Sequence, residues 1–360
     1  MTLKPNPLWL MEAADQSGVT SAARHLAAGV FRSGMRLTIF TLRAGEGVGE
    51  FAQIGCPLHI FPHMGGWVFG KTAVLEAAKR GINLVHALSP TMAKRGMRLA
   101  KRLGAPFVVT ANRLDEGEYS RLVGFSGAGV IAVSDAIKER LANVAGIGQD
   151  KIRVIPNGLD LTCFPRPEFM LPSDRQARIP VVGTLGHLSE RKGQRVFLQA
   201  VKELVEQGVD AEFMVLGDGP DRAALRNLAG ELGIAKRVTF TPQSVSGQLS
   251  QLDLLVEPSF QEGLGLSVMQ AMAAGVPVVA SGVGGLYSLI EDGKTGLMFQ
   301  VGDHSGLAKA MRRLLDRRDE RLDLARQARE MLEEKFNADL IASRLGDFYL
   351  KCLKETGGDG

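Results

Sequence analysis

The sequence contains few cysteines and no long apolar run, and each absence excludes a class of protein. Its three cysteines, Cys56, Cys163 and Cys352, are isolated, odd in number and form no CxxC motif. This pattern fits a reducing cytoplasm and indicates neither a disulfide framework nor a metal cluster. No stretch of about 18 consecutive apolar residues occurs, so the sequence predicts no membrane-spanning helix.

Other familiar signatures are missing as well. The first residues, MTLKPNPLWLMEA, lack the charged start and long apolar segment of a signal peptide, so none is expected. Aromatic residues make up 6% of the chain and form no interleaved stacking motif, so nucleic-acid binding is not predicted. The loop from Asp15 to Thr20 has one glycine, Gly18, rather than G-x-G-x-x-G, which argues against a dinucleotide-dependent oxidoreductase.

What the chain does contain is the length and pattern of two α/β domains. It has 360 residues, of which 45% are apolar, enough for two separate cores. Apolar strands alternate with helical stretches, which predicts doubly wound parallel sheets. Residues 165–180 contain four prolines and interrupt the alternation, as a linker would. We expect domains at 1–166 and 167–335, with a C-terminal helix at 336–360 packing back on the first domain.

Charge is unevenly distributed between the two halves. Residues 1–166 contain 20 Lys and Arg against 12 Asp and Glu, whereas the remainder contains 23 against 27. The basic first half indicates an anionic partner, either a membrane surface or an acidic acceptor, or else ordinary surface charge. In residues 91–103, five cations share one flank of a predicted helix: Lys94, Arg95, Arg98, Lys101 and Arg102. A solvated covering helix is the ordinary interpretation, and docking onto anionic lipid, with Trp67 and Phe69 of a nearby loop as anchors, is the alternative.

The most informative stretch is VEPSFQEGLGLSVMQAMAAGVPVVAS, residues 256–281. It predicts a strand, a loop, a helix from Leu266 to Ala274 and another strand. Gly263 and Gly265 flank Leu264 where the helix begins, so backbone N–H groups there can approach an anion closely. A carboxylate, Glu262, stands beside this predicted phosphate site, which makes sense if it faces the sugar of a sugar diphosphate.

Several segments resemble the retaining glycosyltransferases of family 4 (group 1). They occur in the family's order, and the likeness covers nearly all of residues 129–316: KIRVIPNGLDLTCF (151–164), VLGDGPDR (215–222), the loop at 260–266 with the helix and strand at 269–279, and GGLYSLIEDGKTGLMFQVGD (284–303). The resemblance implies a GT-B fold, in which two Rossmann-like domains face each other across a cleft. It also implies sugar transfer from a nucleotide sugar without a divalent metal or other cofactor, and the chain has no Asp-x-Asp pair.

The resemblance assigns donor-binding residues in the second domain. The family's paired acids, with seven residues between them, are Glu262 and, in place of the second acid, Gln270. Glu262 is implied at the transferred sugar and Gln270 at the ribose, although Ser267 to Gln270 also reads as a capping box. The family's G-R-x-x-x-x-K-G segment appears as GHLSERKG, with Lys192 and either His187 or Arg191 at the diphosphate. The amides of Gly263, Leu264, Gly265 and Leu266 complete the predicted donor site.

In the first domain, the resemblance implies fewer residues. Asn112 stands where a histidine often contacts the donor sugar, and Gly18 lies in the position of the family's phosphate-contacting loop. We therefore predict Glu262, Lys192 and Asn112 as catalytic residues. His86 alone is more typical of a hydrogen-bonded core histidine.

Together these features predict a metal-independent, retaining hexosyltransferase. By analogy with the family, its acceptor is a cell-envelope glycan or a lipid-linked sugar, and its location is the cytoplasm or the inner face of the membrane. The replacements at positions 270, 187 and 112 leave a second hypothesis open, namely a nucleotide-sugar-binding or scaffold subunit that has lost turnover. The presence of both Glu262 and Lys192 favours the enzyme. The nucleotide base, the sugar and the oligomeric state are not predicted.

Overall fold

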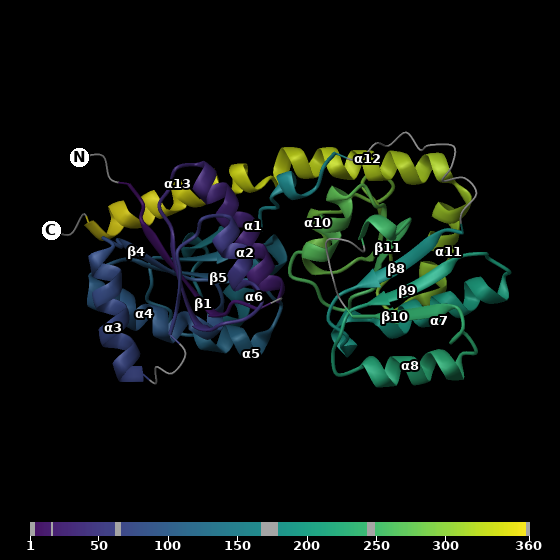
Figure 1. Ribbon diagram of the computed structural model, residues 1–360, viewed down its shortest axis with the longest axis horizontal. Helices are drawn as coiled ribbons and strands as arrows, with labels where there is room; N and C mark the ends of the chain where they lie inside the picture. Colours follow the sequence, from purple (N-terminus) through teal and green to yellow (C-terminus); the bar gives the residue numbers. More distant parts are fainter. Residues whose placement is uncertain (1–3, 16, 62–65, 167–178, 243–248, 358–360) are drawn as a thin grey trace. The chain divides into compact units, whose positions relative to one another are not determined.

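The computed structural model describes residues 4–15, 17–61, 66–166, 179–242 and 249–357. The chain forms two compact units (Figure 1), one comprising Met1–Asp160 with Phe336–Gly360 and the other Leu161–Lys335. The boundary thus lies just before the predicted one at 166. Residues 167–178, most of the predicted linker, lie outside the described residues.

The first unit contains a seven-stranded parallel sheet in the order β3-β2-β1-β4-β5-β6-β7. Its strands are β1 (Pro7–Ala13), β2 (Thr38–Arg43), β3 (Leu58–Ile60), β4 (Leu84–Ala87), β5 (Phe107–Ala111), β6 (Gly129–Ala132) and β7 (Ile152–Val154). Its helices are α1 (Gly18–Arg32), α2 (Val48–Gln53), α3 (Gly66–Lys79), α4 (Ala93–Leu103), α5 (Glu116–Tyr119), α6 (Asp135–Ala145) and α13 (Ala338–Gly357).

Helix α13 belongs to the first unit although it follows the whole second unit in sequence. It packs along α1, where Gly29 leaves room for the backbone at Ala338. The Tyr349 hydroxyl accepts a hydrogen bond of 2.8 Å from Trp9 Nε1 in β1. Both side chains are fully buried in an apolar cluster. Phe336 and Asn337 form the break that precedes α13, and Asn337 pairs with Leu159 in an isolated bridge.

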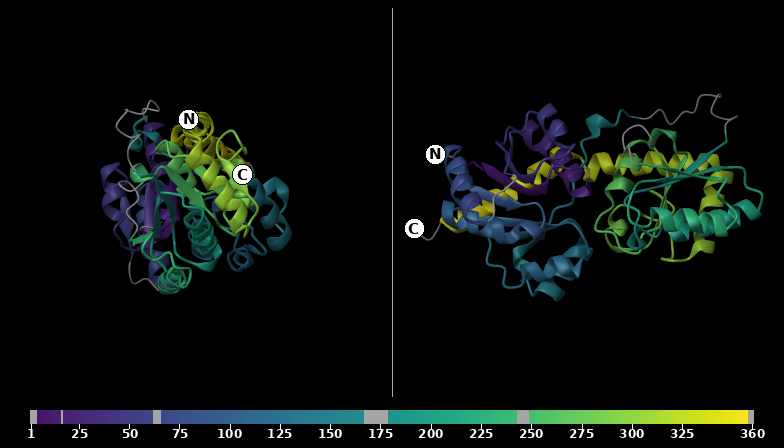
Figure 2. Two further views of the ribbon diagram at one scale, coloured as in Figure 1. Left: turned by 90° about the vertical axis from the view of Figure 1, so that its right-hand side faces the viewer. Right: turned by 60° about the horizontal axis from the view of Figure 1, so that its bottom comes forward.

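The second unit contains a six-stranded parallel sheet in the order β10-β9-β8-β11-β12-β13. Its strands are β8 (Val181–Leu185), β9 (Glu212–Leu216), β10 (Val238–Thr241), β11 (Leu254–Glu257), β12 (Val278–Ser281) and β13 (Leu297–Phe299). Its helices are α7 (Gln194–Glu206), α8 (Arg222–Glu231), α10 (Leu266–Ala273), α11 (His304–Asp316) and α12 (Arg318–Lys335). Helices cover both faces of the sheet in each unit (Figure 2).

Strand order identifies the edge of each sheet where a ligand is expected. Ligands of open parallel sheets bind at the carboxyl ends of the strands, where the strand order reverses. In the second unit this point lies between β8 and β11, and in the first between β1 and β4. The loops that follow β8 and β11 contain Lys192 and Glu262. Lys192 and Glu262 therefore lie at the edge of the sheet where a ligand is expected.

Two local predictions differ from the structure. Helix α3 begins at Gly66, so the backbone of Trp67 and Phe69 is helical rather than in a loop, while their side chains lie outside the described structure. The capping box from Ser267 to Gln270 is wrong, because the N-cap of α10 is Gly265 and Ser267 bonds elsewhere. Among the helices in the described ranges, none is both long and apolar enough to cross a membrane.

Candidate functional site

Lys192 is held at the carboxyl ends of β8 and β11 by close backbone packing. It ends a single 3₁₀ turn, η6 (Glu190–Lys192), and is followed by Gly193 with φ of +67°. A side chain at Gly193 would be strained at that φ and would clash with the carbonyl oxygen of Pro258. The backbone N–H of Phe260 also donates to the carbonyl oxygen of Arg191 over 2.9 Å. The turn is thus fastened to the segment that follows β11.

The Lys192 ammonium group lies between two carboxylates. Its Nζ is 2.5 Å from Glu262 Oε2 and 3.3 Å from Glu257 Oε1. The side chains are 12% exposed for Lys192, 14% for Glu262 and 3% for Glu257. Glu262 also accepts a hydrogen bond from the Gly263 amide. The predicted pair of Glu262 and Lys192 is therefore in direct contact, within a site that is largely shielded from solvent.

Both members of this pair are charged at neutral pH. Burial alone would raise the pKa of Glu262, but the charge and the hydrogen bond of Lys192 outweigh it and hold that pKa below its ordinary value. Burial alone would lower the pKa of Lys192, but the charges of Glu257 and Glu262 raise it above its ordinary value. The site therefore presents a fixed ammonium group at neutral pH.

The lowered pKa of Glu262 predicts a pH dependence of stability. A carboxylate favoured by folding stabilises the protein fully above its ordinary pKa of 4.5, and this contribution is lost as the pH falls through the lower folded-state pKa. We expect the difference in free energy of unfolding between wild type and Glu262→Gln to be constant near neutral pH and to shrink in acid. Urea unfolding over a pH series measures it, with Glu190→Gln, an exposed glutamate of the turn that contains Lys192, as the control. A difference that does not change with pH would contradict this assignment.

Glu257 is the site residue that sequence reasoning missed. It is the last residue of β11 and is buried. Its Oε1 accepts a hydrogen bond of 2.5 Å from Ser259 Oγ, and its Oε2 accepts one of 2.7 Å from Ser267 Oγ. One signal in the sequence could have found it: the apolar strand LLVE ends in a charged residue. A charge is seldom fully buried unless it is paired, so a partner for Glu257 was to be expected.

The amino end of α10 offers backbone donors beside these charges. Gly265 is the N-cap of α10, with φ of +102°, and no side chain of the described residues caps the first amides of this helix. The preceding loop, Gly263 to Gly265, is buried. The Gly285 amide donates to the Glu262 carbonyl over 3.0 Å, which fixes the loop from its other side. Uncapped amides at the positive end of a helix favour an anion.

The other predicted donor residues of the second unit lie in the loop after β8 and in α10. Arg191 is exposed, and its guanidinium group donates to the Gln261 carbonyl over 3.0 Å. His187 is exposed in the loop after β8, and its carbonyl oxygen accepts from the Gln194 side chain. Gln270 lies in α10 and is 5% exposed.

Gly18 and Asn112, by contrast, belong to the first unit. Asn112 follows β5, and its Nδ2 donates to the Leu88 carbonyl over 2.8 Å. Gly18 is exposed at the start of α1, where the N-cap is Ser17. Both positions follow carboxyl ends of strands in the first sheet.

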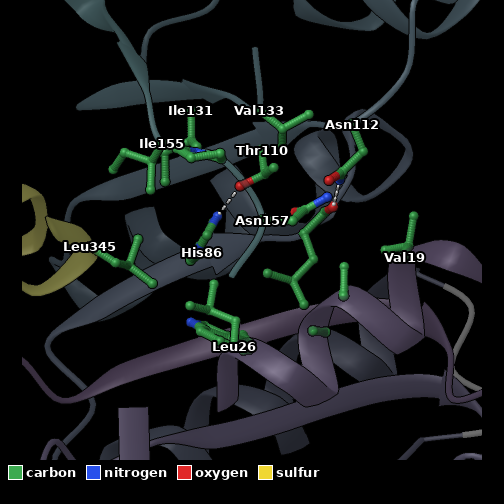
Figure 3. A pocket seen from close by; sticks show the side chains of 15 residues that line it. Val19, Leu26, His86, Thr110, Asn112, Ile131, Val133, Ile155, Asn157 and Leu345 are labelled. Carbon is green, nitrogen blue, oxygen red and sulfur yellow. Dashed lines mark hydrogen bonds between the residues drawn. The ribbon is translucent and has the colours of Figure 1, made fainter. Parts of the chain in front are cut away.

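A mostly apolar pocket lies next to Asn112 within the first unit (Figure 3). Thr110, Asn112 and Asn157 supply polar groups on one side, while Val19 and Leu26 face them from α1. The lining residues are Trp9, Val19, Ala22, Ala23, Leu26, His86, Leu88, Thr110, Asn112, Ile131, Val133, Ile155, Pro156, Asn157 and Leu345. The pocket therefore lies at the carboxyl ends of the strands, as expected for a ligand site.

His86 is a core histidine, as its sequence context predicted. Its Nδ1 lies 2.6 Å from the Tyr349 hydroxyl and its Nε2 lies 2.7 Å from Thr110 Oγ1. Burial lowers the pKa of His86 to about 3, so the ring is neutral. Among the described residues, no group of three or more His, Cys, Asp or Glu side chains is arranged to hold a metal ion.

The fold and the geometry of the site indicate a Rossmann-like domain that binds a phosphorylated ligand. A doubly wound sheet with an ammonium group at its switch point, beside uncapped helix amides, is typical of a Rossmann-like domain that binds a phosphorylated ligand. A family model described as "Glycosyl transferases group 1" matches residues 179–317, and one described as "Glycosyltransferase Family 4" matches residues 16–162. The chain belongs to this family of group 1, family 4 glycosyltransferases.

Individual relatives agree with this assignment. The chain is 34% identical over 239 residues to the 2-deoxystreptamine glucosyltransferase of Streptomyces kanamyceticus, a match that covers 63% of this chain and 61% of that protein. It is 31% identical over 277 residues to the D-inositol 3-phosphate glycosyltransferase of Nocardia farcinica, covering 71% and 59%. The matches thus span about three fifths of the length of these two relatives.

Solved structures show the fold. The Anabaena protein HepE, in complex with UDP and glucose, is 20% identical, with a TM-score of 0.85 over 96% of this chain and 100% of HepE. This likeness and the two parallel sheets confirm the predicted GT-B fold with its two Rossmann-like domains.

Proposed function

We propose that the protein is a retaining glycosyltransferase that moves a hexose from a nucleotide-diphosphate sugar to a hydroxyl group of an acceptor, without a metal ion. The observation that carries this proposal is the Lys192 ammonium group, charged and shielded beside the amino end of α10. A cation beside backbone N–H donors at a helix end is a favourable site for a diphosphate. The names of the relatives and the UDP and glucose in the HepE crystal support a sugar nucleotide as the donor.

Donor binding requires an exchange of partners at Lys192. The diphosphate takes the place of the Glu262 carboxylate at the ammonium group and accepts hydrogen bonds from the amides of Gly263 to Leu266. Arg191 or His187 contacts the same phosphates, while Gln270 bonds ribose hydroxyls. Released from Lys192, Glu262 turns to the transferred sugar.

The chemical step then exchanges one bond for another at the anomeric carbon. The acceptor oxygen forms its bond on the face from which the diphosphate departs, and the leaving phosphate oxygen takes the acceptor's proton. Negative charge grows on the diphosphate, where Lys192 and the helix amides stabilise it. Positive charge grows on the sugar, where the Glu262 carboxylate stabilises it. Asn112 bonds a sugar hydroxyl.

The acceptor that we propose is a cell-envelope glycan or a lipid-linked sugar. The two relatives named above carry the names of cyclitol acceptors, 2-deoxystreptamine and D-inositol 3-phosphate. A test of acceptors therefore includes both compounds beside envelope extracts.

The experiment combines donor binding with turnover. Calorimetry with UDP-, GDP- and ADP-hexoses identifies the donor, and release of the nucleoside diphosphate with the acceptor panel measures transfer. We expect an α-linked product from an α-linked donor by NMR, and an unchanged rate in EDTA. Binding of a donor without transfer or slow hydrolysis would favour the scaffold hypothesis instead. A β-linked product would contradict retention.

We also propose that α4 holds the protein against an anionic membrane surface, on the cytoplasmic side. All five of its cations are exposed, and none forms an ion pair with a residue that the structure describes. Its opposite face is buried against the first unit. Leu75 of α3 is 63% exposed and Val123, which follows a neighbouring 3₁₀ turn, is 65% exposed. Cations beside exposed apolar side chains fit a lipid surface better than an acidic glycan.

Vesicle flotation tests this surface. Each cation near an anionic membrane contributes about 1 kcal/mol, so Arg98→Gln with Arg102→Gln is expected to weaken binding to phosphatidylglycerol vesicles by at least about tenfold. The matched control, Lys236→Gln with Lys309→Gln, removes two exposed cations of the second unit and should bind as wild type does. Equal binding to pure phosphatidylcholine vesicles, or equal loss in both variants, would refute the proposal.

A further inference from the structure

Glu257 contacts both of the groups that we propose bind the diphosphate, the Lys192 ammonium group and the first turn of α10. One of its oxygens contacts the Lys192 ammonium group, and the other accepts from Ser267 in the first turn of α10. One carboxylate is therefore connected to both the cation and the helix end. The side chain of Glu257 is 3% exposed, so we do not expect it to contact the donor or the acceptor directly.

The two carboxylates at Lys192 differ in how firmly they are held. Glu262 lies in the loop between β11 and α10 and has one further hydrogen bond, from the adjacent Gly263 amide. Glu257 ends a buried strand and accepts from two serine hydroxyls. Ser259 is itself fixed, because its carbonyl oxygen accepts a hydrogen bond of 2.5 Å from Ser281 at the end of β12. The side chain of Glu262 is therefore held by fewer hydrogen bonds than that of Glu257.

We propose that Glu257 is a positioning residue, which keeps the Lys192 ammonium group in place while Glu262 exchanges that group for the donor. The inference rests on the proposed function. Without Glu257, the lysine would have one carboxylate partner, the less firmly held Glu262, and would lose its place when Glu262 turned to the sugar. With Glu257, the distance between the ammonium group and the amino end of α10 is set before the donor arrives. Such preorganisation lowers the free-energy cost of binding.

A simpler role would be structural. Glu257 could merely accept two serine hydroxyls and so fasten α10 to β11, with its contact to Lys192 a consequence. The two roles differ in one respect. A positioning role acts through Lys192 and vanishes when the lysine is removed, whereas a structural role acts through α10 and persists.

A double-mutant cycle on nucleotide binding separates them. The dissociation constant of UDP is measured by calorimetry for wild type, Glu257→Gln, Lys192→Met and the double variant. We expect Glu257→Gln to weaken UDP binding about tenfold in the wild-type background and to change it less than about twofold beside Lys192→Met. Equal weakening in both backgrounds, or none in either, would overturn the proposal.

Ser267→Ala is the matched control. It removes the bond to α10 and leaves the contact between Glu257 and Lys192, so UDP binding is expected to stay within about threefold of wild type. A loss as large as that of Glu257→Gln would show that Glu257 acts by holding α10. If Glu257→Gln does not fold, Glu257→Asp replaces it in the cycle, with the same expected pattern, because the shortened carboxylate no longer reaches the ammonium group.

A second measurement needs no nucleotide. Removal of one of its two carboxylate partners lowers the pKa of Lys192, so more of the free amine reacts with acetic anhydride at a given pH. Peptide mass spectrometry should show several-fold faster labelling of Lys192 in Glu257→Gln and unchanged labelling in Ser267→Ala. Unchanged labelling in both would refute the proposal. If the wild type binds no nucleoside diphosphate at all, the proposed function fails, while the labelling still decides whether Glu257 controls Lys192.

Discussion

Glu262→Ala is expected to lower the rate of sugar transfer at least about 10³-fold, the effect of removing a group that stabilises charge in a transition state. The fold should survive, because Glu262 lies in a loop and Lys192 keeps its contact with Glu257. The measurement is kcat with saturating donor, together with the thermal unfolding temperature. Because the carboxylate is expected to act on the sugar rather than on the diphosphate, UDP binding should be retained.

The control for this prediction is Gln261→Ala, the preceding loop residue. Its carbonyl oxygen accepts from Arg191, a contact that the substitution leaves in place. Its rate should stay within about twofold of wild type, because the exposed side chain of Gln261 has no part in the proposed mechanism and its stability effect should be small. A rate near wild type for Glu262→Ala would remove this residue from the mechanism.

Lys192→Met is expected to have two large effects. Transfer should fall about 10²–10³-fold, since the charge opposite the leaving diphosphate is lost. The free energy of unfolding should also fall by about 3–5 kcal/mol, because the substitution leaves the buried Glu257 without a counter-charge. Urea unfolding and kcat/KM measure the two effects separately.

The double variant separates stability from activity. Adding Glu257→Gln to Lys192→Met removes the uncompensated carboxylate and should recover part of the lost stability. Activity should not recover, since the ammonium group is still absent. If the double variant is no more stable than Lys192→Met, the two residues do not form the buried pair described above.

The sequence predicted the fold through its periodicity. Apolar strands that alternate with helical segments specify parallel sheets covered on both faces, and the two sheets confirm this. Local start and stop signals were less informative. The pattern from Ser267 to Gln270 has the residues of a capping box, but the Glu257 carboxylate binds the Ser267 hydroxyl, and the N-cap is Gly265. A tertiary contact prevailed over a local one.

The same division applies to the site. The sequence by itself determined which residues we propose for the donor site, because Lys192, Glu262 and the glycines around Leu264 stand at fixed spacing in recognisable loops. Only the tertiary structure decided that Glu257 is the second partner of Lys192. These two residues lie on different strand ends, and strand order, which brings β8 next to β11, is set by packing across the whole sheet rather than by any short segment.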